Sequence, residues 1–191
     1  MEQGRIMFDG GVQDAVQKYN MNVQSTGNKG GKAPHVLYEL PPPEKAAFAI
    51  TKLELFDFDG NPKPIVATGD DLAIRITYHA SRRIPRASVE LQFNGYDGSR
   101  LLYLAMDPDS GFSTELSPGE HTVECLIESL PFAAGDYVIG SGLIVPYVDD
   151  RLSWTPNLCR LTVLENDFYG SGFPLKQERS LIVTRHHWRH I

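Results

Sequence analysis

The sequence predicts an all-β protein built as an immunoglobulin-like antiparallel β-sandwich. Apolar and polar residues alternate in short runs, for example at Val89, Leu91 and Phe93. Because side chains two residues apart point to one face of a strand, each run buries one face and exposes the other. Turn residues such as Asp97-Gly98 separate the runs, as in strands joined by hairpins. Seven strands at this spacing predict the sandwich, over residues 48–57, 71–79, 87–95, 99–106, 120–129, 136–146 and 157–165.

Two segments precede the sandwich. Residues 1–19 have the pattern of a short strand, a turn and a helix, and this αβ piece is too short to bury its own apolar face. Residues 20–47 have the composition of a linker, rich in glycine at first and then stiffened by prolines at positions 41–43. We therefore expect the end of a larger domain, then a linker that contributes little to stability, then one sandwich domain over residues 48–191.

A C-terminal tail, residues 167–191, follows the last predicted strand. Its root, Gly170-Ser171-Gly172, is free to turn, and Leu181–Val183 is strand-like. Such an extra strand can fold back on its own domain, or it can be exchanged and pair with the sheet edge of another subunit. Exchange would make the protein a homodimer.

Composition indicates a globular protein with no general attraction to nucleic acid. The formal net charge is -6, and 41% of the residues are hydrophobic. No apolar stretch approaches the ~18 residues that a membrane helix needs. Cys125 and Cys159 both lie in strand patterns. Buried thiols in a reducing compartment are the favoured interpretation, with an intersheet disulfide as the alternative, so we expect a cytoplasmic location.

The sequence contains no recognisable catalytic constellation. It has neither a glycine-rich phosphate loop ending in Lys-Ser or Lys-Thr nor a Gly-x-Ser-x-Gly nucleophile elbow. The adjacent carboxylates Asp149-Asp150 point apart on an extended chain and favour a surface turn. Histidines near the terminus favour a solvated tail over a metal site, at His186, His187 and His190. We expect no enzyme activity, metal or cofactor in this chain.

The outer face of three predicted strands is a better candidate for a site. In an immunoglobulin-type sheet the strands at 87–95, 136–146 and 157–165 are neighbours. Alternation places planar polar side chains outside, around a strip with two glycines, and a strand glycine often marks close approach by a ligand or another backbone. Amides and carboxylates suit sugar hydroxyls, and rings at the strand ends could stack on a sugar. The candidate carbohydrate-binding residues are Glu90, Gln92, Asn94, Gly140, Gly142, Arg160 and Thr162, with Tyr96, Tyr147 and Trp154 as stacking residues.

Other interpretations of this face remain open. It could be an ordinary solvated sheet face whose glycines accommodate a packed subunit. The opposite sheet, which should expose Arg75, Thr77 and His79, is the next place for a site. Tyr137 follows Gly135-Asp136 and could form the tyrosine corner of immunoglobulin-like folds, or it could be merely half-buried.

The order of these features resembles the C-terminal domain of Wzt-type ATPase subunits, from ABC transporters that export O-antigen polysaccharide. Gly4-Arg5-Ile6, Asp9-Gly10 and Tyr19 are similar to the last strand, turn and helix of the nucleotide-binding domain in that family. The opening and later strands of the sandwich and the terminal segment are similar as well, through Ile50, Leu53-Glu54-Leu55, Asp59-Gly60, Thr68-Gly69-Asp70-Asp71-Leu72, Leu130-Pro131-Phe132, Gly135-Asp136-Tyr137, Leu161-Thr162-Val163, Gly170-Ser171-Gly172 and Trp188.

The resemblance implies a carbohydrate-binding module that recognises the exported O-antigen polysaccharide. It implies a homodimer, joined in the full protein to an ATPase domain and a transmembrane subunit, and so peripheral to the inner membrane on its cytoplasmic side. The ATP-binding motifs of the family are missing here, so this chain should not hydrolyse ATP by itself. Two other functions remain: a structural dimerisation domain that contacts no sugar, and a polysaccharide-modifying hydrolase, which the missing catalytic residues disfavour.

Overall fold

The computed structural model describes residues 33–42, 44, 46–147 and 150–190, and their regular structure is entirely β. The strand, turn and helix expected within residues 1–19 lie outside the described residues. The strands are β1 (Val36–Glu39), β2 (Phe48–Phe56), β3 (Val66–Ala67), β4 (Leu72–Ala80), β5 (Ile84–Asn94), β6 (Arg100–Ala105), β7 (Thr114–Leu116), β8 (Gly119–Ile127), β9 (Gly135–Val145) and β10 (Asp150–Leu164).

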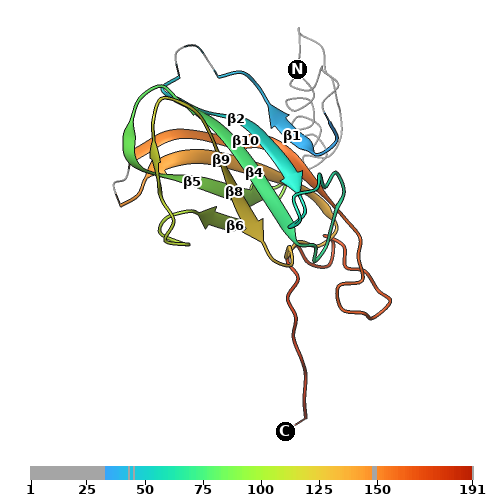
Figure 1. The fold of residues 1–191 in the computed structure, drawn as a ribbon. Helices are drawn as coiled ribbons and strands as arrows, with labels where there is room; N and C mark the ends of the chain where they lie inside the picture. Colours follow the sequence, from blue (N-terminus) through green and yellow to red (C-terminus); the bar gives the residue numbers. More distant parts are fainter. Residues whose placement is uncertain (1–32, 43, 45, 148–149, 191) are drawn as a thin grey trace, which may run out of the picture.

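The strands form two layers, as Figure 1 shows. A 4-stranded sheet has the order β1-β2-β4-β8, and a 6-stranded sheet has the order β3-β10-β9-β5-β6, with β7 paired to β5 outside this path. All of these pairs are antiparallel except β3 with β10. The predicted all-β sandwich is confirmed, and the strands expected to be neighbours, β5, β9 and β10, lie side by side.

The core lies between the two sheets, where alternation predicted it. On β5 the inward residues Val89, Leu91 and Phe93 are at most 3% exposed, and Ile74 and Ile76 of β4 face them from the other sheet. Burial of these apolar side chains is the main stabilising contribution to the fold. No disulfide joins Cys125 and Cys159. The described residues include no helix that could cross a bilayer.

The prediction of a linker over residues 20–47 is wrong at its C-terminal end, where β1 forms. β1 pairs antiparallel with β2 and adds an edge to the smaller sheet. Leu37 and Tyr38 are half-buried against the core. The glycine- and lysine-rich composition of residues 25–32 suggested a linker, but it does not extend to the apolar run at 36–38, which has a sheet edge to pair with.

The C-terminal segment folds back on its own domain as far as Thr184. The amide of Val183 donates to the carbonyl of Pro131 (2.8 Å), and its side chain is 3% exposed. Tyr137 is fully buried, and its hydroxyl donates to the carbonyls of Ala133 (2.7 Å) and Leu181 (3.1 Å). This confirms the tyrosine corner and shows that it also holds the tail. Beyond this point the chain extends away from the sandwich (Figure 1).

Candidate functional site

The larger sheet brings most of the predicted site residues onto one surface. Across the β5–β9 pairing, Glu90 lies opposite Gly142 and Gln92 opposite Gly140. Trp154 of β10 lies opposite Gly142 on the other side. Because paired residues share a face, these residues all belong to the surface that points away from the core. We call this surface the outer face.

Glu90 is the centre of one cluster on the outer face. Its carboxylate is almost fully buried, accepts a hydrogen bond from the Tyr103 hydroxyl and lies 3.7 Å from the Arg151 guanidinium. The Arg151 guanidinium in turn lies 4.5 Å from the centre of the Trp154 ring. Burial raises the pKa of Glu90, although the charges of Arg151 and Arg100 oppose the shift. The expectation that Glu90 lies in water is therefore wrong, because these neighbours cover it.

A second cluster surrounds Arg160 near the far end of β5. Its guanidinium donates to the carboxylate of Asp136, which also accepts from the Thr162 hydroxyl (2.6 Å). The guanidinium lies 5.2 Å from the centre of the Tyr96 ring. Burial, reinforced by the Asp136 carboxylate, raises the pKa of Tyr96 to about 12. One planar cation, one ring and one carboxylate are thus fixed together.

Gln92 and Asn94 lie between the two clusters. The Gln92 amide donates to the Asn94 carbonyl oxygen (2.7 Å). Asn94 is only 6% exposed, so the expectation that its side chain faces water is also wrong. Gln92 is half-buried and remains accessible in part.

The glycine strip is not open. A Cβ on Gly142 would lie 2.3 Å from the carbonyl oxygen of Ser153, and one on Gly140 would lie 2.7 Å from that of Pro156. The pairing of β10 with β9 shifts register on both sides of this stretch. The two glycines leave room for the backbone of β10 and not for a ligand. The prediction that they form an open strip for a sugar is therefore wrong.

The three predicted stacking residues are not gathered at one place. Trp154 lies on the outer face over Gly142 and Tyr96 lies beside Arg160. Tyr147 lies apart from both, beyond the opposite end of β5. Its hydroxyl donates to Asp107 (2.8 Å), and the Arg86 guanidinium covers its ring at 4.9 Å.

Sequence reasoning missed Tyr103, Arg151 and Asp136. Tyr103 could have been found, because β6 pairs with β5 and alternation puts its ring beside Gln92. Asp136 begins the predicted strand 136–146 but was not assigned to the site, although it lies opposite Thr162. The position of Arg151 depends on the irregular start of β10, which no periodicity reveals.

Buried polar atoms without hydrogen-bond partners concentrate on the outer face. Among the described residues there are five such atoms: Glu90 Oε2, Gln92 Oε1, the Tyr96 hydroxyl, Arg160 Nε and, elsewhere on β10, Ser153 Oγ. Buried polar groups normally have partners, so unmatched donors and acceptors indicate a place where a polar ligand or water can bind.

The outer surface of the smaller sheet differs in this respect. Arg75 pairs with Glu124 (2.9 Å), and Thr77 bonds Thr122 (3.1 Å). His79 is half-buried on the same strand. Because Arg75 and Thr77 are already satisfied by neighbouring side chains, this fallback surface is the weaker candidate.

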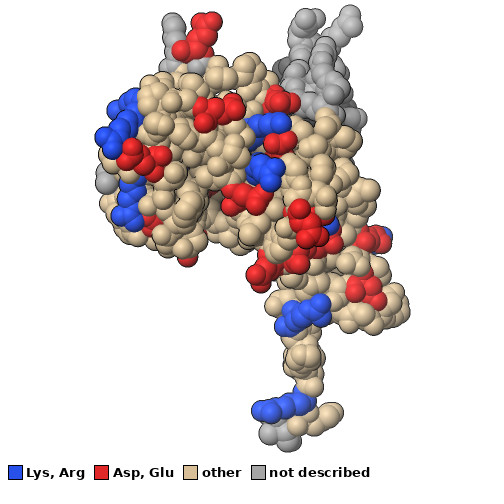
Figure 2. All heavy atoms as spheres, viewed as in Figure 1, with Lys and Arg blue, Asp and Glu red and all other residues tan. Residues whose placement is uncertain are grey.

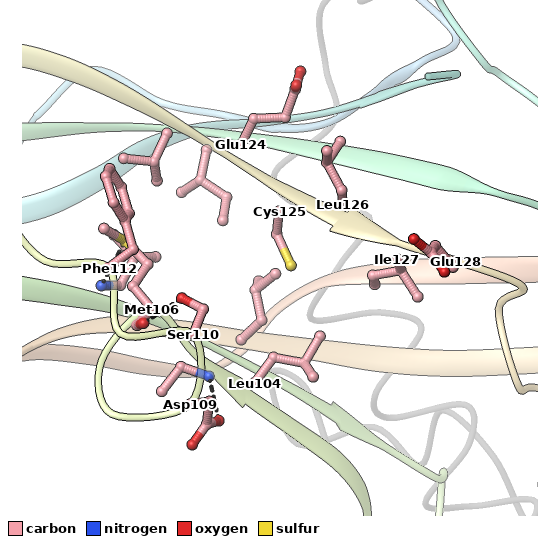
Figure 3. A pocket seen from close by; sticks show the side chains of 15 residues that line it. Leu104, Met106, Asp109, Ser110, Phe112, Glu124, Cys125, Leu126, Ile127 and Glu128 are labelled. Carbon is pink, nitrogen blue, oxygen red and sulfur yellow. Dashed lines mark hydrogen bonds between the residues drawn. The ribbon is translucent and has the colours of Figure 1, made fainter.

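An apolar cavity opens between the layers, along the edges formed by β8 and β6. Its volume is about 450 Å³, and the Cys125 side chain points into it beside Leu104 and Ile127 (Figure 3). Burial raises the pKa of the Cys125 thiol. Three carboxylates lie at its margin, those of Asp109, Glu124 and Glu128. Among the described residues no three His, Cys, Asp or Glu side chains come together in a way that could hold a metal ion.

Comparison with known proteins places this fold. No curated protein matches the chain. The crystal structure of the C-terminal domain of Wzt matches with a TM-score of 0.64 at 12% identity, covering 88% of this chain and 95% of that one. A Pseudomonas fluorescens alkylpurine DNA glycosylase, AlkC, bound to DNA containing an abasic site analog, reaches a TM-score of 0.39 at 9% identity, covering 62% and 31%, too low to support any argument. The family model described as the Wzt C-terminal domain matches residues 45–173, and the chain therefore belongs to the Wzt C-terminal domain family.

Proposed function

We propose that this domain binds O-antigen polysaccharide through the outer face of the larger sheet, on behalf of an ABC transporter. The family supports association with an ABC transporter. The observation that carries the proposal is that two buried polar atoms, Gln92 Oε1 and Arg160 Nε, lack a hydrogen-bond partner and lie between the Trp154 and Tyr96 rings.

The chemistry of this group suits a neutral sugar. The half-buried Gln92 offers an acceptor to a sugar hydroxyl, and Arg160 offers a donor. The guanidinium groups of Arg151 and Arg160 are both opposed by carboxylates. With the charges compensated in this way, hydrogen bonds and ring stacking would supply the recognition.

Titration with the host polysaccharide tests the proposal. Gln92→Ala removes an unpaired acceptor, and loss of a hydrogen bond of about 1 kcal/mol should weaken binding roughly fivefold. Glu120→Ala, on the exposed face of β8, is the matched control and should bind normally. Gly142→Trp is unsuitable as a test because it would displace the Ser153 carbonyl. Full affinity in Gln92→Ala and in Arg160→Ala would contradict the proposal.

In the full protein the domain would be joined to an ATPase domain and a transmembrane subunit, on the cytoplasmic side of the inner membrane. The domain itself would bind and not catalyse. Its contribution would be to bring the polysaccharide to the transporter. Binding of this kind requires neither a cofactor nor ATP hydrolysis.

A dimerisation domain without sugar contact is the second candidate. Trp188 is 92% exposed at the end of the extended segment, and Leu126 and Phe112 are exposed beside the apolar cavity, whose margin carries three carboxylates. Exposed apolar side chains, together with cations on the extended segment and carboxylates at the cavity margin, favour contact between copies of the chain. Because residues up to Thr184 pack on their own domain, the informative deletion is 185–191. Light scattering should then report monomers, and an unchanged dimer would exclude this segment as the interface.

A further inference from the structure

A cationic hollow lies between the loop at 167–173 and the C-terminal segment. Its volume is about 740 Å³. The side chains that line it include Arg179, Arg185, His186 and His187, together with Tyr169 and Phe173. No carboxylate of the described residues lines it, although the whole chain is acidic, with a formal net charge of -6.

The walls of the hollow are fixed to the sandwich and to each other. Phe168 packs against Gly69, and the Tyr169 hydroxyl donates to the Thr184 carbonyl (2.9 Å), which joins the two walls. The Asp167 carboxylate accepts from the amides of Ser171 (2.9 Å) and Gly172 (2.6 Å). Its negative charge is therefore used within the loop, and these amides lower its pKa.

The cations of the hollow have no anionic partner among the described residues. Neither Arg179 nor Arg185 forms an ion pair, whereas the nearby Lys176 is held by Glu165 (3.0 Å). The Arg185 guanidinium lies 4.9 Å from the centre of the Phe168 ring, which orients it. Figure 2 shows Lys and Arg, without Asp or Glu, along this extended segment, whereas both signs are mixed over the body.

We propose that this hollow binds a phosphate group. Guanidinium groups match the geometry of phosphate oxygens, and the imidazoles of His186 and His187 add donors. Phe173, 75% exposed at the margin, would contact the apolar part of the phosphate ester. The same chemistry fits a phospholipid headgroup and a soluble phosphate ester. This site is separate from the outer face and does not depend on its function.

Two probes separate the sources of the phosphate. Calorimetry with inorganic pyrophosphate reports a soluble ligand, and co-sedimentation with phosphatidylcholine vesicles, with and without phosphatidylglycerol, reports a headgroup. Binding to either probe should weaken as salt is added, because exposed charges are screened. Arg179→Gln and Arg185→Gln should each weaken binding about tenfold, as expected for loss of a charge-assisted contact.

Arg82→Gln is the matched control, because it makes the same change in net charge and its guanidinium lies 5.6 Å from the Phe48 ring, away from the hollow. It should bind as the unmodified chain does. Pyrophosphate binding alone would identify a soluble ester, and binding to anionic vesicles alone would identify a headgroup. No binding to either probe, or equal binding by all three variants, would overturn the proposal. Polysaccharide binding by Arg179→Gln should be unchanged, which keeps the two proposals distinguishable.

Discussion

The hydroxyl of Tyr137 offers the sharpest test of how the tail is held. Tyr137→Phe removes one oxygen from a fully buried ring and leaves the ring itself in place. Two carbonyls, those of Ala133 and Leu181, lose this donor. The amide of Ala133 still donates to the Leu181 carbonyl (3.2 Å), so the main loss is at Ala133.

The expected loss of stability follows from these contacts. One net hydrogen bond contributes about 1 kcal/mol, and a buried acceptor left without its donor adds roughly 1 kcal/mol more. For a chain of this size each kcal/mol lowers Tm by about 2–4 °C, so Tyr137→Phe should lower Tm by about 4–8 °C.

Thermal and urea unfolding, followed by circular dichroism, measure this loss. Tyr169→Phe is the control: its hydroxyl also donates to a carbonyl, that of Thr184, but at an exposed position, and the change should cost little. A Tyr137→Phe variant as stable as the unmodified protein would refute the role assigned to this corner. Equal losses of stability in both variants would show that the cost comes from losing a hydrogen bond to a carbonyl, whether or not that carbonyl is buried.

Three further predictions follow from the fold. Because burial raises the pKa of Glu90 in the folded state, the free energy of unfolding should fall as pH rises above the unfolded pKa of 4.5. In Glu90→Gln this contribution should vanish. Urea titrations of both proteins at several pH values would show it as a smaller dependence of the unfolding free energy on pH in the variant. A chain beginning at Lys45 lacks β1 and should melt below one beginning at Ala33; equal Tm values would mean that β1 adds nothing. Gly142→Ala should cost about 1–3 kcal/mol in urea unfolding because its Cβ meets the Ser153 carbonyl, and unchanged stability would show that β10 yields without cost.

Alternation in the sequence predicted the layers and the faces of the strands. It placed Val89, Leu91 and Phe93 inside, and all are buried. It also assigned Glu90 to the correct side of its sheet. Periodicity reports only the side from which a residue leaves the strand, however, and not what lies above it. The ring of Tyr103 and the guanidinium of Arg151 decide the environment of Glu90, and both come from other strands.

The irregular parts of the fold could not be predicted in this way. Gly142 was taken as the floor of an open strip because its neighbour in space was unknown. That neighbour, the backbone at Ser153, is placed by a register shift in β10, which local sequence does not encode. The strand at Val36–Glu39 was missed because a four-residue run becomes a strand only when a partner edge is present.

The two long edges of the sandwich are unequally closed, and this has a dynamic consequence. On one side β1 and β3 add strands beyond β2 and β10, whereas on the other β8 is the last strand of its sheet and lies over the apolar cavity. Side chains of β8 that point inward, such as Val123 and Cys125, are only half-buried. Amide hydrogen exchange should therefore begin at β8, through small openings that leave β2 and β4 protected, because this strand lies at the sheet edge beyond β4 and its inward side chains line the cavity. The sandwich would thus open first along its β8 edge, while the opposite edge, to which β1 and β3 add strands, stays closed.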